Sequence, residues 1–165
     1  MALPELSLTE WVVLALVAEA PSHGFAIAKE LESESDLGRV LTVHRPLVYR
    51  ALDRLRAHEL VEAATTEPGR GPTRTVMRVT RRGRSALKAW FVAPVEHVRE
   101  LRIEFLAKLR LTERIDGDPS ALVAAQRGEL VDRLANLASQ DSDDVVDLWR
   151  QHNAVAAQAF LDSLP

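Results

Sequence analysis

The segment from Thr42 to Ala63 has the sequence TVHRPLVYRALDRLRAHELVEA. From Arg45 to Arg56 it holds four arginines and one acid, Asp53, although the whole chain of 165 residues has a formal net charge of −3. A general excess of basic residues therefore does not explain these arginines. Their concentration indicates a local partner of opposite charge.

The same segment predicts a helix from Pro46 to His58. Proline suits the first helical position because its fixed φ angle is already helical and it has no N–H group that needs a partner. On a helical wheel Val48, Leu52 and Leu55 fall on one face, which we expect to be buried. The exposed side is expected to carry Tyr49, Arg50, Asp53 and Ala57, with Arg54 at its edge.

Two helices are predicted before this segment. Ser7 and Glu10 have the spacing of a capping box at the start of the first, which is apolar almost all round and therefore buried. We expect Ser22 to cap the second. Its inward side is expected to consist of Phe25, Ile27, Ala28 and Leu31. Residues 41–43 are expected to form a short strand.

After the segment the pattern changes to that of a β-hairpin. Residues 60–66 and 74–80 are short runs rich in Val and Thr, and residues 67–73 between them contain two prolines and two glycines. Thr80 is then placed to cap a fourth helix that ends before Pro94. The order helix, helix, helix, hairpin, helix is that of a winged helix-turn-helix domain.

The bulk composition is that of a soluble globular protein, with 47% hydrophobic and 27% charged residues. The chain has no cysteine, which excludes disulfides and thiolate zinc sites. The longest apolar run, Trp11–Ala18, is far shorter than the roughly 20 residues that span a bilayer. It also lacks the basic flank of a signal peptide. We therefore expect a cytoplasmic protein with no membrane partner.

The charge is distributed in three blocks. Residues 38–90 carry twelve basic and four acidic side chains, residues 1–37 one basic and seven acidic, and residues 91–165 eight basic and thirteen acidic. A basic block between two acidic ones indicates a surface that binds a polyanion. An ordinary solvated surface is the alternative interpretation.

Beyond Pro94 the chain is predicted to be helical to its end. Apolar residues recur at helical spacing in three stripes: Val98, Leu101, Phe105 and Leu109; Val123, Leu130, Leu134 and Leu137; and Val145, Leu148, Trp149, His152, Val155, Ala156, Ala159 and Phe160. Acids in residues 141–144 suit the N-terminus of the last helix. We expect these helices to pack on one another and on a second copy of the chain.

Trp149 and His152 share one face of the last helix, and two interpretations stay open. They could line a pocket for a small aromatic effector between subunits. They could instead be packed in the interface itself with no ligand.

Six residues are candidates for contact with double-stranded DNA: Arg45, Tyr49, Arg50, Arg54, Arg70 and Arg74. Arg50 and Arg54 lie four positions apart on one helix and repel each other, which a phosphate backbone would relieve. An exposed arginine near a helix N-terminus also suits guanine edges in the major groove. The alternative for each arginine is a solvated surface residue.

The hairpin arginines and Tyr49 extend this surface. Arg70 at the hairpin tip and Arg74 at its base would carry the positive charge to an adjacent groove. Tyr49 could pack its ring against the domain and place its hydroxyl on a phosphate.

No motif for catalysis, metal binding or cofactor binding is found. The five histidines are scattered and form no HExxH, and the glycines Gly69 and Gly71 belong to no GxxxxGK. A GxSxG elbow and a cysteine nucleophile are absent as well. We therefore expect a protein that is not an enzyme and has no cofactor or metal.

Four stretches together resemble the PadR family of bacterial transcriptional regulators: Leu6–Leu31, Pro46–Leu55, Glu59–Ala63 and Gly71–Trp90. The helical remainder is similar, more loosely, to the dimerisation region of the family's larger subgroup. The resemblance implies a homodimer that binds a pseudo-palindromic operator, usually as a repressor, and that a small effector releases in several members. Glu59 departs from the usual glycine after the recognition helix, and Met77 from the usual aromatic residue in the second wing strand.

The expected fold is mainly α. A winged helix-turn-helix DNA-binding domain with a two-stranded wing, residues 1–92, precedes a C-terminal α-helical dimerisation domain, residues 93–165. The function expected is sequence-specific transcriptional regulation by a homodimeric repressor. The alternative is a helical protein-interaction adaptor that keeps the winged-helix fold without using it on DNA, its arginines binding an acidic partner.

Overall fold

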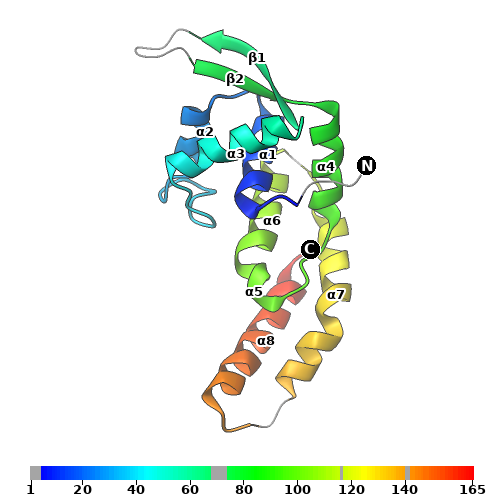
Figure 1. The fold of residues 1–165 in the computed structure, drawn as a ribbon. Coiled ribbons are helices and arrows are strands. Elements are labelled where there is room, and N and C mark those ends of the chain that lie inside the picture. Colours follow the sequence, from blue (N-terminus) through cyan, green and yellow to red (C-terminus); the bar gives the residue numbers. More distant parts are fainter. Residues whose placement is uncertain (1–4, 68–73, 116, 140–141) are drawn as a thin grey trace. The chain divides into compact units, whose positions relative to one another are not determined.

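The computed structural model describes residues 5–67, 74–115, 117–139 and 142–165, which form two compact units, Met1–Phe91 and Val92–Pro165. In chain order the elements are α1 (Leu8–Glu19), α2 (Gly24–Glu30), α3 (Arg45–Ala57), β1 (Val61–Glu67), β2 (Arg74–Val79), α4 (Arg81–Val92), α5 (Val98–Glu100), the π-helical segment η1 (Leu101–Phe105), α6 (Leu106–Arg114), α7 (Ser120–Ala138) and α8 (Val145–Ser163) (Figure 1). The mainly helical class with a two-stranded antiparallel wing is confirmed.

α1 is the central helix of the first unit. Both halves of the predicted capping box are present, since the Glu10 amide donates to the Ser7 hydroxyl and the Ser7 amide donates to the Glu10 carboxylate. Residues from Val12 to Val17 are all buried, as a helix apolar on every side requires. Trp11 stacks on Trp90 of α4 with ring centroids 5.4 Å apart.

The predicted start of the second helix is wrong by one residue. The cap of α2 is His23, whose Nδ1 accepts a hydrogen bond from the Ala26 amide at 3.1 Å. Ser22 instead pairs with Met77 of β2 through two backbone hydrogen bonds of 2.8 and 3.0 Å. Pairing with an edge of the hairpin thus takes the backbone of Ser22 out of the capping position.

The short strand predicted at residues 41–43 is also wrong. The Leu41 amide donates to the Leu37 carbonyl and the Val43 amide donates to the Leu31 carbonyl at the end of α2. Both hydrogen bonds are satisfied within the connection between α2 and α3. The Val and Thr content of this stretch reflects the burial of Val43, which is 5% exposed, rather than strand pairing.

The wing forms largely as predicted. β1 and β2 pair antiparallel from Val61 opposite Val79 to Glu67 opposite Arg74, with an irregularity between Ala63 and Thr65. Thr80 caps α4, because its hydroxyl accepts the Gly83 amide at 3.0 Å. The packing of the second strand, which the missing aromatic residue left open, is secured by Met77, whose side chain is buried.

All regular elements of the second unit are helices within its described residues. Figure 1 shows α7 and α8 side by side and antiparallel, and α5, η1 and α6 follow one another without a break. The core combines Leu101 and Phe105 with Val123, Leu130 and Leu134 of α7, which confirms the first two predicted stripes. Asp144 caps α8 by accepting the amides of residues 146 and 147, so the predicted acidic start is confirmed as well.

The buried side of α8 differs from the predicted stripe. Ala154 and Leu161 are fully buried, whereas Trp149 is 70% and Val145 75% exposed. The predicted stripe therefore lies mostly on the side of α8 that faces away from α7. No helix in the described ranges is long and apolar enough to span a membrane.

The segment that follows α4 is bound to the helices of the second unit. The Gln126 side chain accepts the Val95 amide at 2.8 Å and donates to the Val95 carbonyl at 2.9 Å. The Lys108 ammonium donates to the Ala93 carbonyl at 2.8 Å and pairs with Glu104 at 2.9 Å. These buried polar side chains fix the backbone at the start of the unit.

Candidate nucleic-acid interface

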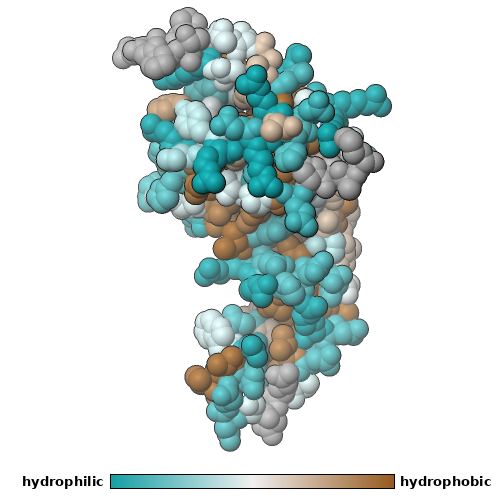
Figure 2. All heavy atoms as spheres, viewed as in Figure 1, coloured by the Kyte–Doolittle hydropathy of each residue, from teal (hydrophilic) through white to brown (hydrophobic). Residues whose placement is uncertain are grey.

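The sequence builds α3 as an amphipathic helix with a basic outer side. Val48, Leu52 and Leu55 are buried, as predicted, and pack toward α1 and α2. Tyr49 and Arg50 lie on the outer side, where Tyr49 is 45% exposed. Figure 2 shows that the surface of the first unit over α3 is mostly hydrophilic.

Arg50 lies in a shallow depression of about 250 Å³ formed by α3 and the start of α1, with Leu47 and Thr9 in its lining. Its guanidinium makes no hydrogen bond or ion pair with any side chain or backbone group that the structure describes. An exposed arginine without a protein partner keeps all its N–H donors available to an external acceptor.

Arg54 has a different environment. Its Nε lies 3.2 Å from the Glu10 carboxylate and its Nη2 donates to the Glu5 carbonyl at 3.1 Å. Glu10 is buried, so this ion pair ties the N-terminus of α1 to α3. Among the predicted arginines with described positions, Arg54 is the one paired with a carboxylate. The ion pair with Glu10 neutralises part of the positive charge of α3.

Arg45 and Arg74 come together on an aromatic ring. Arg45 opens α3 and Arg74 opens β2, and their Cζ atoms lie 4.7 and 5.0 Å from the ring centroid of Phe25. Phe25 was predicted on the buried side of α2, and that prediction is wrong. The ring is 38% exposed. The sequence could have predicted this exposure, because at 100° per residue Phe25 lies about 160° from Ile27 on a helical wheel.

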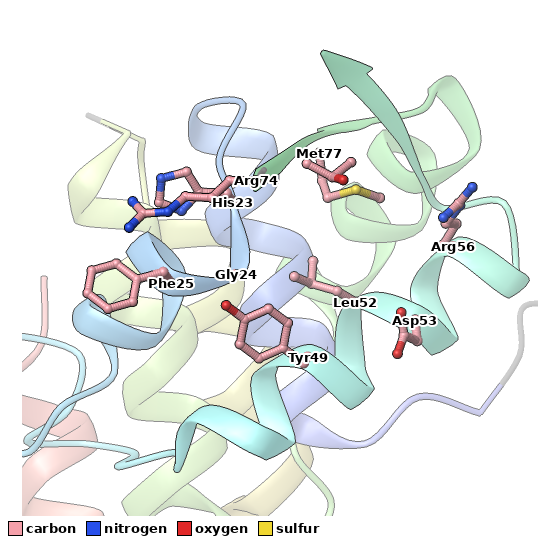
Figure 3. A pocket seen from close by; sticks show the side chains of 10 residues that line it. His23, Gly24, Phe25, Tyr49, Leu52, Asp53, Arg56, Arg74 and Met77 are labelled. Atoms are coloured by element: carbon pink, nitrogen blue, oxygen red, sulfur yellow. The ribbon is translucent and has the colours of Figure 1, made fainter. Parts of the chain in front are cut away.

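A groove of about 490 Å³ is lined by Phe25 and Arg74 together with residues of the outer side of α3. Figure 3 shows Tyr49 and Asp53 of α3 on one side of it, and His23 and Arg74 on the other. Tyr49 lies against Gly24, where an added Cβ would be 2.6 Å from the Tyr49 Cε1. The absence of a side chain at Gly24 therefore allows the ring of Tyr49 to take its position.

Two predicted site residues lie in the second unit, and one is not among the described residues. Arg70 falls outside the described residues. Trp149 and His152 are both exposed on α8, in the second unit. Within the described ranges, no group of three or more His, Asp or Glu side chains is arranged to hold a metal ion.

The first unit has the architecture of the winged helix-turn-helix class, with α2 and α3 as the helix-turn-helix, β1 and β2 as the wing and a basic outer side on α3. The comparison with family models agrees: residues 13–89 match the transcriptional regulator PadR-like family. The chain thus carries a PadR-like domain over these residues, as the resemblance predicted.

One solved structure with a TM-score of 0.50 shows the same fold, and two further structures match with lower scores. PadR of Bacillus subtilis in complex with operator DNA superimposes with a TM-score of 0.50 at 17% identity, covering 93% of this chain and 96% of that one. A PadR family transcription regulator from hypervirulent Clostridium difficile R20291 matches at 17% identity, covering 67% and 100%, with a TM-score of 0.43. The Vibrio cholerae virulence activator AphA matches at 24% identity, covering 94% and 92%, with a TM-score of 0.45. No curated protein matches this chain significantly.

Proposed function

We propose that the protein is a homodimeric transcriptional repressor that binds a pseudo-palindromic operator in double-stranded DNA and is released by a small effector. The observation that carries the DNA-binding part is the outer side of α3. There Tyr49 lines a groove together with Arg74 of β2, Arg45 opens the helix and Arg50 is exposed, and none of these three arginines pairs with a described carboxylate.

The contacts divide by position. Arg50, on the outer side of α3 and within its first two turns, is assigned to a base edge in the major groove. Arg45, Arg74 and the Tyr49 hydroxyl are assigned to phosphates, which fix the register of the protein on the duplex. Arg54 is assigned to holding α1 against α3, because Glu10 already binds it. Arg70 is kept as a phosphate contact on the strength of the sequence.

The homodimer is supported by the outward side of α8. Val145, Trp149 and Val155 are 75%, 70% and 54% exposed, and they recur along that side of one helix. Figure 2 shows a hydrophobic surface over the first part of α8. Exposed apolar side chains aligned on one helix face are typical of a protein–protein interface. A second copy of the chain would cover them and would supply the other half-site contact.

The effector is assigned to the same side of α8, near Trp149 and His152. An aromatic ligand stacked on Trp149 at a subunit interface would alter the arrangement of the two protomers. Candidate aromatic acids should quench tryptophan fluorescence saturably, and the Trp149→Phe variant should lose that response. The absence of a saturable response in the wild-type protein would remove the effector from the proposal.

DNA binding is tested with the DNA upstream of the gene that encodes the protein. We expect a specific electrophoretic shift and a footprint with twofold symmetry. Arg50→Ala should cost about 1–3 kcal/mol of operator affinity, as expected for loss of a bidentate base contact. Arg99→Ala, which removes an exposed arginine from the second unit, is the matched control and should bind like the wild type.

Salt dependence and gene expression complete the test. A dimer with six to ten phosphate contacts should lose about 10³–10⁵ in affinity between 50 and 200 mM salt. Deletion of the gene should raise transcription from the bound promoter if the protein is a repressor. Binding that is insensitive to salt, or the same footprint with Arg50→Ala, would show that α3 does not read DNA.

A further inference from the structure

Phe25 is an exposed aromatic residue in contact with two arginines from two other elements. The ring belongs to α2, Arg45 to the start of α3 and Arg74 to the start of β2, and both Cζ atoms lie within 5.0 Å of the ring centroid. Figure 3 shows the guanidinium of Arg74 beside the Phe25 ring. One side chain therefore joins the helix-turn-helix to the wing.

Core packing does not account for this ring. Ile27 and Leu31 are 1% and 0% exposed, whereas Phe25 points to the other side of α2 and remains 38% exposed. A cation above an aromatic face is attracted by the ring quadrupole, and the planar guanidinium also stacks on it. Such a contact orders an arginine without using any of its five N–H donors.

The charge at this point is not compensated by the described part of the protein. Neither Arg45 nor Arg74 forms an ion pair with a carboxylate whose side chain is described. Two guanidinium groups drawn to one ring repel each other, and a nearby anion would lower the energy of the pair. Phosphate groups fit because arginine binds them through two parallel N–H donors.

We propose that Phe25 is a positioning residue of the DNA interface: it holds Arg45 and Arg74 so that both bind the phosphate backbone of one DNA strand, beside the starts of α3 and β2. This inference rests on the proposed DNA-binding function. Because the ring orders both side chains before DNA arrives, less side-chain entropy is lost on binding. The contact also fixes the start of β2, which pairs with the end of β1, relative to α3.

The binding test removes the ring and keeps an apolar side chain at this position. Phe25→Leu should lower operator affinity about three- to tenfold, from the loss of two exposed cation–π contacts. Phe25→Tyr retains the ring and should bind like the wild type. Phe25→Met is a second ringless variant in case Phe25→Leu fails to fold, which circular dichroism would reveal.

A double-mutant cycle separates positioning from a general effect on the domain. Arg45→Ala and Arg74→Ala should each weaken DNA binding less in the Phe25→Leu background than in the wild type. Equal losses in both backgrounds would overturn the inference while leaving the proposed function intact. Single methylphosphonate substitutions along the operator should show both arginines responding to the same phosphate or to adjacent ones on one strand. Responses on opposite strands would also overturn it.

A measurement without DNA makes the two proposals independently testable. The ring current of Phe25 should shift the side-chain NMR signals of Arg45 and Arg74 in the free protein, and Phe25→Leu should abolish both shifts. If the wild-type protein bound no DNA, the proposed function would fail even with these shifts present. If DNA bound but neither arginine showed a shift, the role of Phe25 alone would fail.

Discussion

Glu59 has a φ angle of 58°, and it is the non-glycine residue with a positive φ in the described part of the chain. It stands directly after α3 and its cap, where its amide donates to the Arg56 carbonyl and the Leu60 amide donates to the Leu55 carbonyl. These two hydrogen bonds are those of a Schellman motif, whose left-handed position favours glycine. The turn after α3 is therefore made here by a residue whose side chain strains the left-handed conformation.

Glu59→Gly should stabilise the protein by about 0.5–1 kcal/mol. Relief of the left-handed strain is worth roughly 1–2 kcal/mol, and the greater freedom of glycine in the unfolded chain offsets part of it. The exposed pair of Glu59 with Arg82, at 3.6 Å, contributes little. Urea denaturation measures the change, and Glu59→Ala, which keeps the strain, should give no gain.

Gly24 permits a close contact rather than a special backbone conformation. In Gly24→Ala the new Cβ would collide with the Tyr49 ring, and Tyr49 would move because its exposed end is free to rotate. We expect a loss of operator affinity of about three- to tenfold, near 0.7–1.4 kcal/mol, with a change in folding stability below about 1 kcal/mol. Fluorescence anisotropy with labelled operator and thermal denaturation measure the two effects.

Gly128 provides the control for that variant. It lies on the exposed side of α7, where an added Cβ meets nothing within 4 Å. Gly128→Ala should leave operator affinity unchanged and raise stability by roughly 0.5–1 kcal/mol, since glycine is a poor helix former. If Gly24→Ala also left affinity unchanged, the position of Tyr49 would have no part in DNA binding.

At the scale of elements, Gln126 of α7 binds the backbone of Val95 through two hydrogen bonds. Its amide satisfies one backbone donor and one backbone acceptor that are buried and distant in sequence. The π-helical segment η1 and α6 lie between the two partners in the chain. Polar side chains are common on helices, and the periodicity of α7 gave no sign that this one is 0% exposed.

Gln126→Leu should destabilise the second unit by about 2–4 kcal/mol. Leucine fills a similar volume but leaves the Val95 amide and carbonyl buried without partners, and each costs about 1–3 kcal/mol. Chemical denaturation followed by circular dichroism measures the loss. Gln158→Leu removes an amide that donates to Asp162 on the surface and should change stability by less than about 0.5 kcal/mol. Similar losses of unfolding free energy in both variants would contradict the structural role of the Gln126–Val95 hydrogen bonds.

At the scale of the whole molecule, the homodimer that we propose forms through the outward side of α8. When two protomers associate, a carboxylate in the middle of an apolar interface loses its water without gaining a partner. This desolvation strongly disfavours the dimer. Val155→Asp should therefore shift the protein from dimer to monomer in sedimentation velocity. It should also weaken binding to a full operator at least tenfold, with little effect on a single half-site.

Asn136→Asp introduces the same charge on an exposed position of α7 and is the control for that experiment. It should remain dimeric. A wild-type protein that sediments as a monomer at micromolar concentration would contradict the dimer without touching the assignment of α3.

The sequence by itself determined the order of the elements, because periodicity, capping residues and turn residues act over a few neighbours. The buried side of α3, the capping box of α1 and the stripes of Leu101 and Val123 were predictable for that reason. The basic side of α3 was predictable as well, because its outer positions follow from the buried ones.

Only the tertiary structure decided which partners the exposed and polar groups find. In the folded chain Arg54 pairs with Glu10 and the backbone of Ser22 pairs with that of Met77. Arg45 and Arg74 both contact the ring of Phe25. It also turned Trp149 of α8 outward, since α7 packs against the side carrying Ala154 and Leu161. Local periodicity marks a helix face as apolar or basic, but contacts between residues distant in the chain depend on how the elements pack.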